Sequence, residues 1–223
     1  MKLLNSFLQF IFPENCKVCK KSGTLLCPKC LDGLELVSSS RMSKLPNYIN
    51  PIFEYKDSVV QDLIWKFKYS GATSVADIFV VSLHDTVSGL TNDLFETSGA
   101  KGVLLIPIPI TQSRARARGY NQSRLLVESV SAQGPVGRNT LYYPVYDVLK
   151  KKTSSTSQTK SHSRVDRLAN IKGSFFVTDA SMIKGKHIIL IDDVVTTGAT
   201  LGEARKTLLA AGARSVQAVT IAH

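Results

Sequence analysis

The sequence predicts an α/β domain built on a mostly parallel sheet and preceded by a small cysteine-rich segment. Two short, largely apolar runs, Val103 to Ile106 and His187 to Ile191, are typical of strands that are buried on both faces. Segments with apolar side chains at helical spacing lie between these runs. Buried strands that alternate with helices imply parallel pairing through right-handed crossovers. The 223 residues allow one full-sized domain and a small appendage.

A short amphipathic helix is expected near the N-terminus, because Leu3, Leu4, Phe7, Leu8 and Ile11 fall on one helix face. Polar residues interrupt this stretch, and no small-residue cleavage site follows it, which argues against a secretory signal. The longest apolar stretch of the chain is well short of the roughly 18 residues that a membrane span needs. We therefore expect a cytoplasmic protein with no integral membrane segment.

The four cysteines form two C-x-x-C pairs within fifteen residues, namely Cys16, Cys19, Cys27 and Cys30. Pairs this close together can present four thiolates to one tetrahedral Zn²⁺. Four protein ligands leave no position for water, so a bound zinc would be structural. Two disulfides would need an oxidising compartment, and a redox dithiol is normally a single C-x-x-C in a larger α/β domain. We favour zinc and expect metal binding to supply much of this segment's folding free energy.

Residues 38–46 mix Ser, Lys, Arg and Pro without an apolar period, which predicts a linker. We therefore divide the chain into a zinc-binding segment, residues 1–45, and an α/β domain, residues 46–223. In that domain helices are expected over residues 58–69 and 74–88, after a cap at Asn121, and from about Leu201 to Ala211. Further strands are expected at Asp147 to Leu149, Phe175 to Val177 and Val216 to Ile221.

Positive charge is concentrated in one third of the chain. The protein has 28 Lys and Arg residues against 17 Asp and Glu residues, a formal charge of +11. Residues 101–175 alone hold 13 basic and 3 acidic residues. Like charges gathered in this way indicate an anionic partner such as phosphate, pyrophosphate or nucleic acid. A solvated basic surface that serves only solubility is the alternative.

The most informative pattern runs from Ile188 to Thr200, where a buried strand ends in Asp192 and Asp193 and a turn leads directly into a helix. Backbone N–H groups at a helix N-terminus bind phosphate, and Gly198 permits close approach of the backbone. The two acids repel a phosphate and are expected to face a neutral polyol or a cation. A single ligand that carries a phosphate and vicinal hydroxyls fits both features, because its phosphate can bind the helix N-terminus and its hydroxyls can contact the two acids.

The stretch from Ile189 to Thr200 resembles the phosphoribosyl-pyrophosphate (PRPP) loop of type I phosphoribosyltransferases. The whole chain resembles the ComF family, which joins a four-cysteine zinc segment to that fold. The other matching stretches are Tyr55 to Tyr69; Ile106 to Pro109, followed by Arg114 to Gln122; and Gln158 and Thr159 with Arg167 and Asn170.

The resemblance implies a type I phosphoribosyltransferase-like domain, in which helices flank a mostly parallel sheet and Mg²⁺ accompanies PRPP. Asp192 and Asp193 would be catalytic residues at the ribose 2′ and 3′ hydroxyls. The implied PRPP-binding residues are Asp192, Asp193, Val195, Thr196, Thr197, Gly198, Ala199 and Thr200. Pyrophosphate or nucleic-acid contacts are expected from Pro107, Ile108, Arg114, Arg116 and Arg118. If the three arginines lie on a helix, only Arg114 and Arg118 share a face.

Residues 150–163 contain no apolar residue and lie where the superfamily has its flexible catalytic loop. In such a loop Lys152, Lys160 or Arg164 could close over pyrophosphate, and a disordered solubilising loop is the alternative.

Three functions remain open at this stage. The first is Mg²⁺-dependent transfer of 5-phosphoribose from PRPP to an unidentified acceptor, with release of pyrophosphate. The second is handling of single-stranded DNA in natural competence, with a PRPP site that is regulatory or vestigial. In that reading Tyr120, Tyr142, Tyr143 and Tyr146 of the basic segment are candidates for base stacking. The third is an adaptor that docks a competence helicase through the zinc segment.

Overall fold

The computed structural model describes residues 14–134, 141–152 and 171–223. The predicted N-terminal helix lies outside these ranges. So does most of the predicted flexible loop, with Lys160 and Arg164, and the matching stretch that contains Gln158, Thr159, Arg167 and Asn170.

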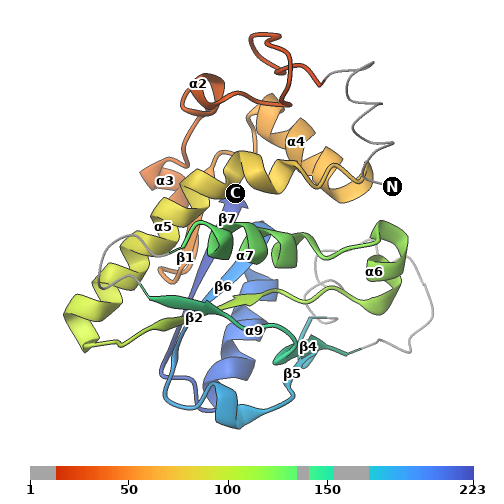
Figure 1. The fold of residues 1–223 in the computed structure, drawn as a ribbon. Coiled ribbons are helices and arrows are strands. Elements are labelled where there is room, and N and C mark those ends of the chain that lie inside the picture. The colour runs from red at the N-terminus through yellow and green to blue at the C-terminus, as the bar shows by residue number, and fades with distance from the viewer. Residues whose placement is uncertain (1–13, 135–140, 153–170) are drawn as a thin grey trace.

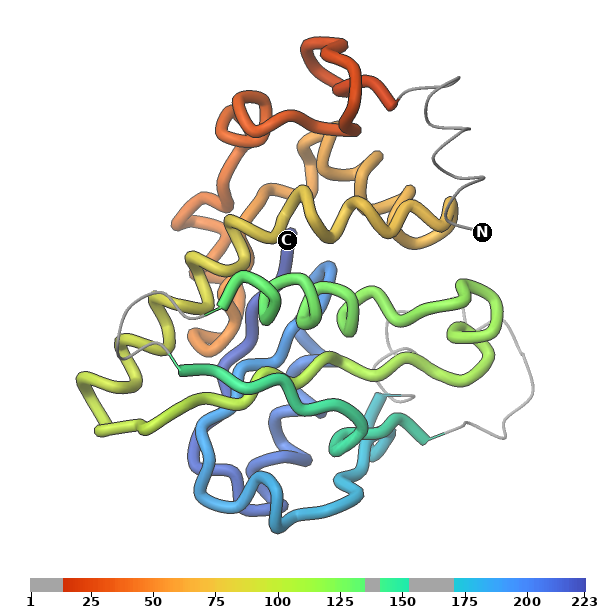
Figure 2. The backbone as a smooth tube through the Cα atoms, in the orientation of Figure 1, coloured from red at the N-terminus to blue at the C-terminus, as the bar shows by residue number. Residues whose placement is uncertain are grey.

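A five-stranded parallel sheet forms the centre of the molecule (Figure 1). Its strand order is β1 (Ile49–Phe53), β7 (Ser215–Ala222), β6 (His187–Val194), β2 (Val103–Pro107) and β3 (Tyr142–Pro144). The first and last strands of the chain therefore pair side by side, and Figure 2 shows the blue C-terminal strand running through the interior. This sheet confirms the predicted fold class, with buried apolar runs at β2 and β6 as expected.

Helices cover both faces of the sheet. One face carries α4 (Ser58–Tyr69), α5 (Val75–Ser98) and α7 (Gln122–Ala132), which pack with the β6 side chains Ile189 and Ile191. The other face carries α9 (Ala199–Ala210), which packs with Ile188 and Leu190. Successive residues of a strand point to opposite faces, so the continuous apolar run of β6 supplies both cores at once.

Smaller elements lie at the edges of this core. The short helices are α2 (Pro28–Leu31), α3 (Ser39–Met42), α6 (Gln112–Arg118) and the 3-10 turn η1 (Ala180–Met182). Strands β4 (Leu149–Lys151) and β5 (Phe175–Val177) pair antiparallel as a separate two-stranded sheet. No helix in the described parts of the chain is long and apolar enough to cross a membrane.

Several predicted boundaries are wrong. The helix expected over 74–88 continues to Ser98 and ends at Gly99, whose positive φ of 64° stops it. The strand expected at Asp147 to Leu149 begins only at Leu149, because Asp147 has left-handed backbone at φ 67°. The sequence analysis missed β3, which has three residues and lies at the sheet edge.

The predicted linker at 38–46 also differs from the structure. It contains helix α3, and the Nη1 atom of Arg41 lies 2.9 Å from Oε2 of the buried Glu54. The cysteine-rich segment before it lies over α4 and α5 (Figure 1), and Cys16, Leu26 and Leu34 share one apolar cluster with α4. The boundary at residue 45 between a zinc-binding segment and an α/β domain stays a prediction. One apolar cluster contains residues from both sides of this boundary.

Candidate functional site

A cleft of about 190 Å³ lies at the carboxyl end of the central strands. Parallel sheets of this kind bind ligands at that edge, where loops and helix N-termini meet. Residues from α4, α6, α7, β4 and β6 reach the cleft, together with the segment after β2. Its lining consists of Lys68, Ile108, Pro109, Ile110, Arg114, Arg118, Gln122, Ser123, Lys151, Asp192, Asp193, Val194 and Thr200.

The two acids of β6 both line this cleft and take different partners. Asp192 Oδ1 accepts hydrogen bonds from Ser123 Oγ at 2.8 Å and from the backbone N–H of Asp193 at 2.9 Å. Asp193 Oδ1 lies 3.1 Å from the ammonium nitrogen of Lys68. The strand does not end at the acids as expected, since β6 continues to Val194. Both carboxylates nevertheless face one space, so one ligand can contact both.

The surroundings of Asp192 raise its pKa towards neutrality. Burial, and then the neighbouring charge of Asp193, raise the pKa of Asp192 to about 7. The hydrogen bonds from Ser123 and the Asp193 backbone, and the charge of Lys68, act in the opposite direction. Asp192 can therefore gain or lose a proton in the physiological range, as functional carboxylates often do.

The turn between β6 and α9 has the shape expected of a phosphate loop. Gly198 is the N-cap of α9, with φ 76°, and no side chain caps the helix there. A Cβ atom at this position would meet the Ile49 side chain at 2.9 Å, so both backbone and space call for glycine. Val195 is buried and donates its backbone N–H to Ala222 O, while Thr196 and Thr197 are exposed.

Within the predicted PRPP set, the structure brings Asp192, Asp193 and Thr200 into the lining of the cleft. The other members, from Val195 to Ala199, form the adjoining turn. Gly198 supplies no side-chain cap to α9, and the first N–H of the helix, that of Ala199, lies 3.4 Å from Thr197 Oγ1. The N–H groups that follow in the first turn lack intrahelical partners, so they can bind an anion.

Helix α6 separates the three predicted arginines. Arg114 and Arg118 line the cleft, whereas Arg116 does not. The spacing of the arginines left two arrangements open: all three on one side of an extended segment, or only Arg114 and Arg118 on one face of a helix. The segment is helical, so the second arrangement holds. Of the segment after β2, Ile108 lines the cleft, and Pro107 lines a neighbouring pocket of about 500 Å³ together with Lys150, Lys151 and Lys152.

The sequence analysis missed four polar residues of the cleft: Lys68, Gln122, Ser123 and Lys151. Lys68 and Gln122 fall inside stretches that resemble the ComF family, which was the available signal. Ser123 carried no signal beyond its place next to the Asn121 cap. For Lys151, burial and then Arg114 lower the pKa, while the charge of Asp192 opposes that change.

A second candidate site is the cysteine cluster. The Sγ atoms of Cys16, Cys19, Cys27 and Cys30 all lie within 4.8 Å of one another, and those of Cys19 and Cys27 are 3.6 Å apart. Sulfurs at about 2.3 Å from a tetrahedral Zn²⁺ lie roughly 3.8 Å apart, so the four thiols fit a metal ion. Burial opposes ionisation of Cys16, but backbone N–H groups of Cys19, Cys27 and Val18 lower its pKa to about 6.

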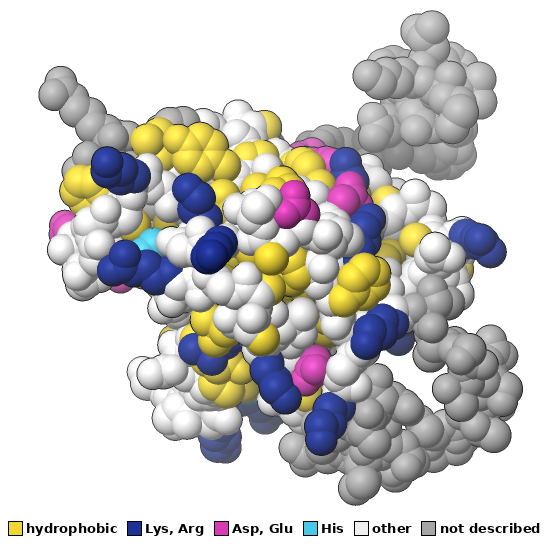
Figure 3. Space-filling view, turned by 90° about the horizontal axis from the view of Figure 1, so that it is seen from below, with side chains coloured by type: hydrophobic (Ala, Val, Ile, Leu, Met, Phe, Trp, Pro, Cys, Tyr) yellow, Lys and Arg dark blue, Asp and Glu magenta, His cyan; other side chains and the backbone are white. Residues whose placement is uncertain are grey.

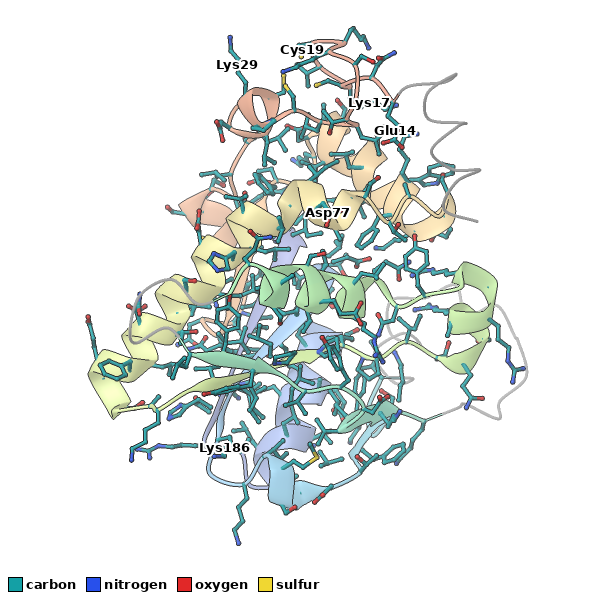
Figure 4. The ribbon with its side chains drawn as sticks, viewed as in Figure 1. Glu14, Lys17, Cys19, Lys29, Asp77 and Lys186 are labelled. Carbon is teal, nitrogen blue, oxygen red and sulfur yellow. The ribbon has the colours of Figure 1, made fainter. Side chains whose placement is uncertain are left out.

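The cysteine cluster lies at the top of the molecule in Figure 4. Lys17, Cys19 and Lys29 gather there in Figure 4, beyond α4. Lys17 Nζ reaches 3.0 Å from Asp62 Oδ2, and Asp62 belongs to α4. This ion pair and the shared apolar cluster attach the cysteine segment to the helix that carries Lys68.

Comparison with known proteins agrees with this geometry. The phosphoribosyl transferase domain family matches residues 121–223, which include Ser123, the acid pair and the loop before α9. Competence protein ComFC of Bacillus subtilis (strain 168) is 30% identical over 171 residues, 76% of this chain and 62% of the relative. Competence protein ComFC of Streptococcus pneumoniae is 28% identical over 221 residues, 97% of this chain and 84% of the relative.

The chain is similar to the ComF-type competence proteins over most of its length. Its residues 121–223 match the phosphoribosyl transferase domain, and its four-cysteine cluster is compatible with a zinc segment. Its alignment spans less than two thirds of the length of the Bacillus relative. Among solved structures, a Trypanosoma cruzi hypoxanthine phosphoribosyl transferase is 14% identical, with a TM-score of 0.36 and 63% of each chain covered.

Proposed function

We propose that the chain binds PRPP together with Mg²⁺ and transfers its 5-phosphoribose group to an acceptor, with release of pyrophosphate. One observation carries the proposal. An acid pair suited to vicinal hydroxyls and the arginines Arg114 and Arg118 line a single cleft, next to an uncapped helix N-terminus. The phosphoribosyltransferase match over residues 121–223 supports the same ligand.

In this proposal each part of the cleft has one task. The backbone N–H groups at the start of α9 and the Thr200 hydroxyl hold the 5′-phosphate. Asp192 and Asp193 accept hydrogen bonds from the ribose 2′ and 3′ hydroxyls. Arg114 and Arg118 bind the pyrophosphate through charge-assisted hydrogen bonds, a role that suits the planar guanidinium group. Bound Mg²⁺ would neutralise charge on the departing pyrophosphate.

During the reaction the bond between ribose C1 and pyrophosphate oxygen breaks, and a bond from C1 to the acceptor forms. The pyrophosphate leaves with the bonding electron pair, and the acceptor loses a proton. Positive charge develops on the sugar ring at the transition state, so two ionised carboxylates beside the ring lower the barrier. Pre-positioned arginines meet the negative charge that develops on the leaving group.

Calorimetry with PRPP and Mg²⁺ tests the binding half of the proposal. Wild-type protein is expected to bind, and Asp193→Asn is expected to lose binding while keeping the wild-type circular dichroism spectrum. Slow hydrolysis of PRPP, followed as pyrophosphate release, tests the chemical half. A wild-type protein that binds neither PRPP nor pyrophosphate would contradict the assignment.

We further propose that the cysteine cluster holds structural zinc and that the protein works in the cytoplasm. The spacing of the four sulfur atoms supports a metal site, and thiolate ligands need a reducing compartment to persist. Two lysines of the same segment, Lys17 and Lys29, would partly offset the negative charge of a four-thiolate site. Metal content of the purified protein, measured by mass spectrometry, tests this point.

A second candidate function is binding of single-stranded DNA, and a specific surface favours it. Trp65 and Tyr69 on α4 are 56% and 64% exposed, with ring centroids 5.9 Å apart. Arg118 lies 5.3 Å from the Tyr69 ring. A pocket of about 340 Å³ beside them is lined by Lys68, Tyr69, Gly71, Arg114, Ala117 and Arg118, with no acid. Exposed rings next to cations are what stacked bases and phosphates require.

The aromatics named from sequence alone support this second function less well. Tyr142 is buried, and Tyr120 donates its hydroxyl to Phe67 O. The Tyr146 ring is covered by Arg124 at 4.5 Å, which leaves Tyr143 half exposed on a distant edge of the sheet. Basic side chains are also dispersed on the face shown in Figure 3, rather than gathered in one patch. The surface around Trp65 is therefore the better candidate.

Trp65 is the single tryptophan of the chain, so its fluorescence reports on this surface directly. Titration with a poly-dT oligonucleotide is expected to quench it, with an affinity that falls steeply as salt increases. Tyr69→Ala should weaken binding, by about 1 to 3 kcal/mol if one base stacks there. Tyr143→Ala, which removes a half-exposed tyrosine elsewhere, is the control. Unchanged affinity of the Tyr69 variant would exclude this surface.

A further inference from the structure

An ion pair links the acid pair to a helix outside the matched domain. Lys68 of α4 lies 3.1 Å from Asp193, and the two side chains are 22% and 9% exposed. Lys68 lies outside residues 121–223, the range that matches the phosphoribosyl transferase domain. Among the described residues, Lys68 alone forms an ion pair with either acid of the cleft. A nearly buried charge pair of this kind costs free energy when either partner is removed.

The end of α4 is fixed by two side chains that bind one carbonyl. Phe67 O accepts hydrogen bonds from Tyr120 Oη at 2.5 Å and from Gln122 Nε2 at 3.1 Å. Carbonyls in the last turn of a helix lack intrahelical partners, so these bonds satisfy a group that would otherwise be unpaired. Gln122 is 1% exposed, and its Oε1 accepts from Arg118 Nη1 at 2.9 Å.

These bonds give a structural reason for the stretch Arg118 to Gln122. Gly119, at φ 81°, ends helix α6 and turns the chain towards α7. Asn121 caps α7 and also donates its Nδ2 to Ile108 O at 3.0 Å. The segment therefore holds the end of α4 on one side and the segment after β2 on the other. Lys68 follows immediately after the carbonyl that is held.

We propose that Lys68 is a positioning residue that favours the ionised form of the Asp192–Asp193 pair and orients it for the ribose hydroxyls, and that Tyr120 and Gln122 set its place. This inference rests on the proposed function, because it concerns the same acid pair. Two adjacent carboxylates in a partly buried cleft repel each other, so one of them takes up a proton unless a cation offsets the charge. A protonated carboxyl group stabilises a developing positive charge poorly.

The other groups that face the acids do not replace Lys68. Arg114 and Arg118 of α6 and Lys151 of β4 line the same cleft without forming an ion pair with either acid in the described structure. From α7 the acids meet the uncharged Ser123 and Gln122. The charge of Lys68 is among the factors that oppose the raised pKa of Asp192.

The test is the pH dependence of the affinity for PRPP with Mg²⁺, measured by calorimetry from pH 6 to 9 on the full chain. Lys68→Met keeps the length of the side chain and removes its charge. We expect about fivefold weaker binding at pH 7 if the pKa of Asp192 rises from about 7 by roughly one unit, and recovery towards wild-type affinity at pH 9. Lys68→Arg should restore the wild-type pH midpoint.

Two further variants separate this role from a general loss of structure. Lys66→Met, on the same helix but outside the lining of the cleft, should behave as wild type. Tyr120→Phe removes one hydroxyl and should shift the pH midpoint in the same direction as Lys68→Met, by a smaller amount. Circular dichroism and melting curves confirm that each variant folds.

The outcomes are distinct. Absence of binding in the wild type overturns the proposed function and this inference with it. Binding by Lys68→Met with the wild-type affinity and pH midpoint overturns the role of Lys68 and leaves the proposed function standing. Weak binding that does not recover at pH 9 also contradicts it, because loss of a charge effect alone is reversible with pH. An unchanged midpoint in Tyr120→Phe overturns the part assigned to the α4 contacts.

Discussion

Ser123, in the first turn of α7, donates its hydroxyl to Oδ1 of Asp192 on β6 at 2.8 Å. Ser123 is 2% exposed, so this hydrogen bond is shielded from water. The same carboxylate oxygen accepts the backbone N–H of Asp193. Together the two donors fix the orientation of Asp192 before any ligand arrives, which lowers the cost of ordering it on binding.

Removal of this hydroxyl should weaken PRPP binding. Ser123→Ala raises the pKa of Asp192 further, because the hydrogen bond that favours the ionised form is lost. We expect a loss of affinity of at least about tenfold at pH 7, because one hydrogen bond to a charged group contributes about 1.5 to 3 kcal/mol. Calorimetry at pH 7 and pH 9 measures it. Ser129→Ala, on an exposed position of the same helix, is the control, and equal affinities of the two variants would contradict the assignment.

The ionised carboxylate of Asp192 should lower the free energy of unfolding at high pH. Its pKa is about 7 in the folded protein against an ordinary value of 3.8, so the folded state binds the proton more tightly than the unfolded state. Stability therefore falls as the pH rises from about 4 through 7. At pH 8, Asp192→Asn should be more stable than wild type by on the order of 1 kcal/mol and should melt at a higher temperature. At pH 4 the variant and the wild type should melt at the same temperature. Thermal melts at both pH values decide this, and a variant that is less stable at pH 8 counts against it.

Gly198 should tolerate no side chain. Alanine there meets Ile49 and must adopt a φ of 76°, so Gly198→Ala should lose about 1 to 3 kcal/mol of stability and bind PRPP more weakly. Gly89→Ala, inside α5 with nothing near the added Cβ, should gain about 0.5 to 1 kcal/mol. Urea unfolding of both variants provides the comparison. Equal effects would show that neither φ nor space matters at residue 198.

Substitutions of the α6 arginines should affect pyrophosphate binding only on the helix face that lines the cleft. Arg114→Ala removes a cation from the cleft and should weaken pyrophosphate binding by about tenfold, while Arg116→Ala should leave it unchanged. Affinity for pyrophosphate with Mg²⁺ is the measurement. A stronger effect of Arg116 than of Arg114 would mean that the anion binds outside the described cleft.

Metal removal should loosen the cysteine segment and then α4. Cys16, Leu25 and Leu26 share an apolar cluster with α4, so loss of the metal should lower the free energy of unfolding by at least about 2 kcal/mol. For a chain of this size that equals a fall of roughly 4 to 8 °C in melting temperature. Calorimetric scans with and without a chelator check it. Cys19→Ser should resemble the chelated protein, and an unaffected melting temperature in both cases would argue against structural zinc.

Local patterns were enough to predict several parts of the molecule. The apolar runs at β2 and β6 predict strands buried on both faces, because a two-sided environment leaves no polar position in such short segments. The same kind of reasoning predicts the turn at Gly198 and a cysteine cluster. Each of these depends on residues close together in the sequence.

Other features escaped sequence reasoning for a physical reason. The three-residue strand β3 has too few residues to show a period, and the end of β6 lies beyond its apolar run. The exposed Trp65–Tyr69 pair lies on a helix whose apolar spacing indicates only that one face is buried. Which rings remain in solvent depends on the orientation of that helix against its neighbours.

The sequence by itself determined the parallel α/β class, the acids and glycine of the loop after β6, and the four metal-ligand candidates. Only the tertiary structure decided which cation and which hydroxyl face the acids. Lys68 and Ser123 come from α4 and α7, and they reach β6 because both helices pack on the same face of the sheet. Contacts between such distant residues arise from packing, and no local spacing encodes them.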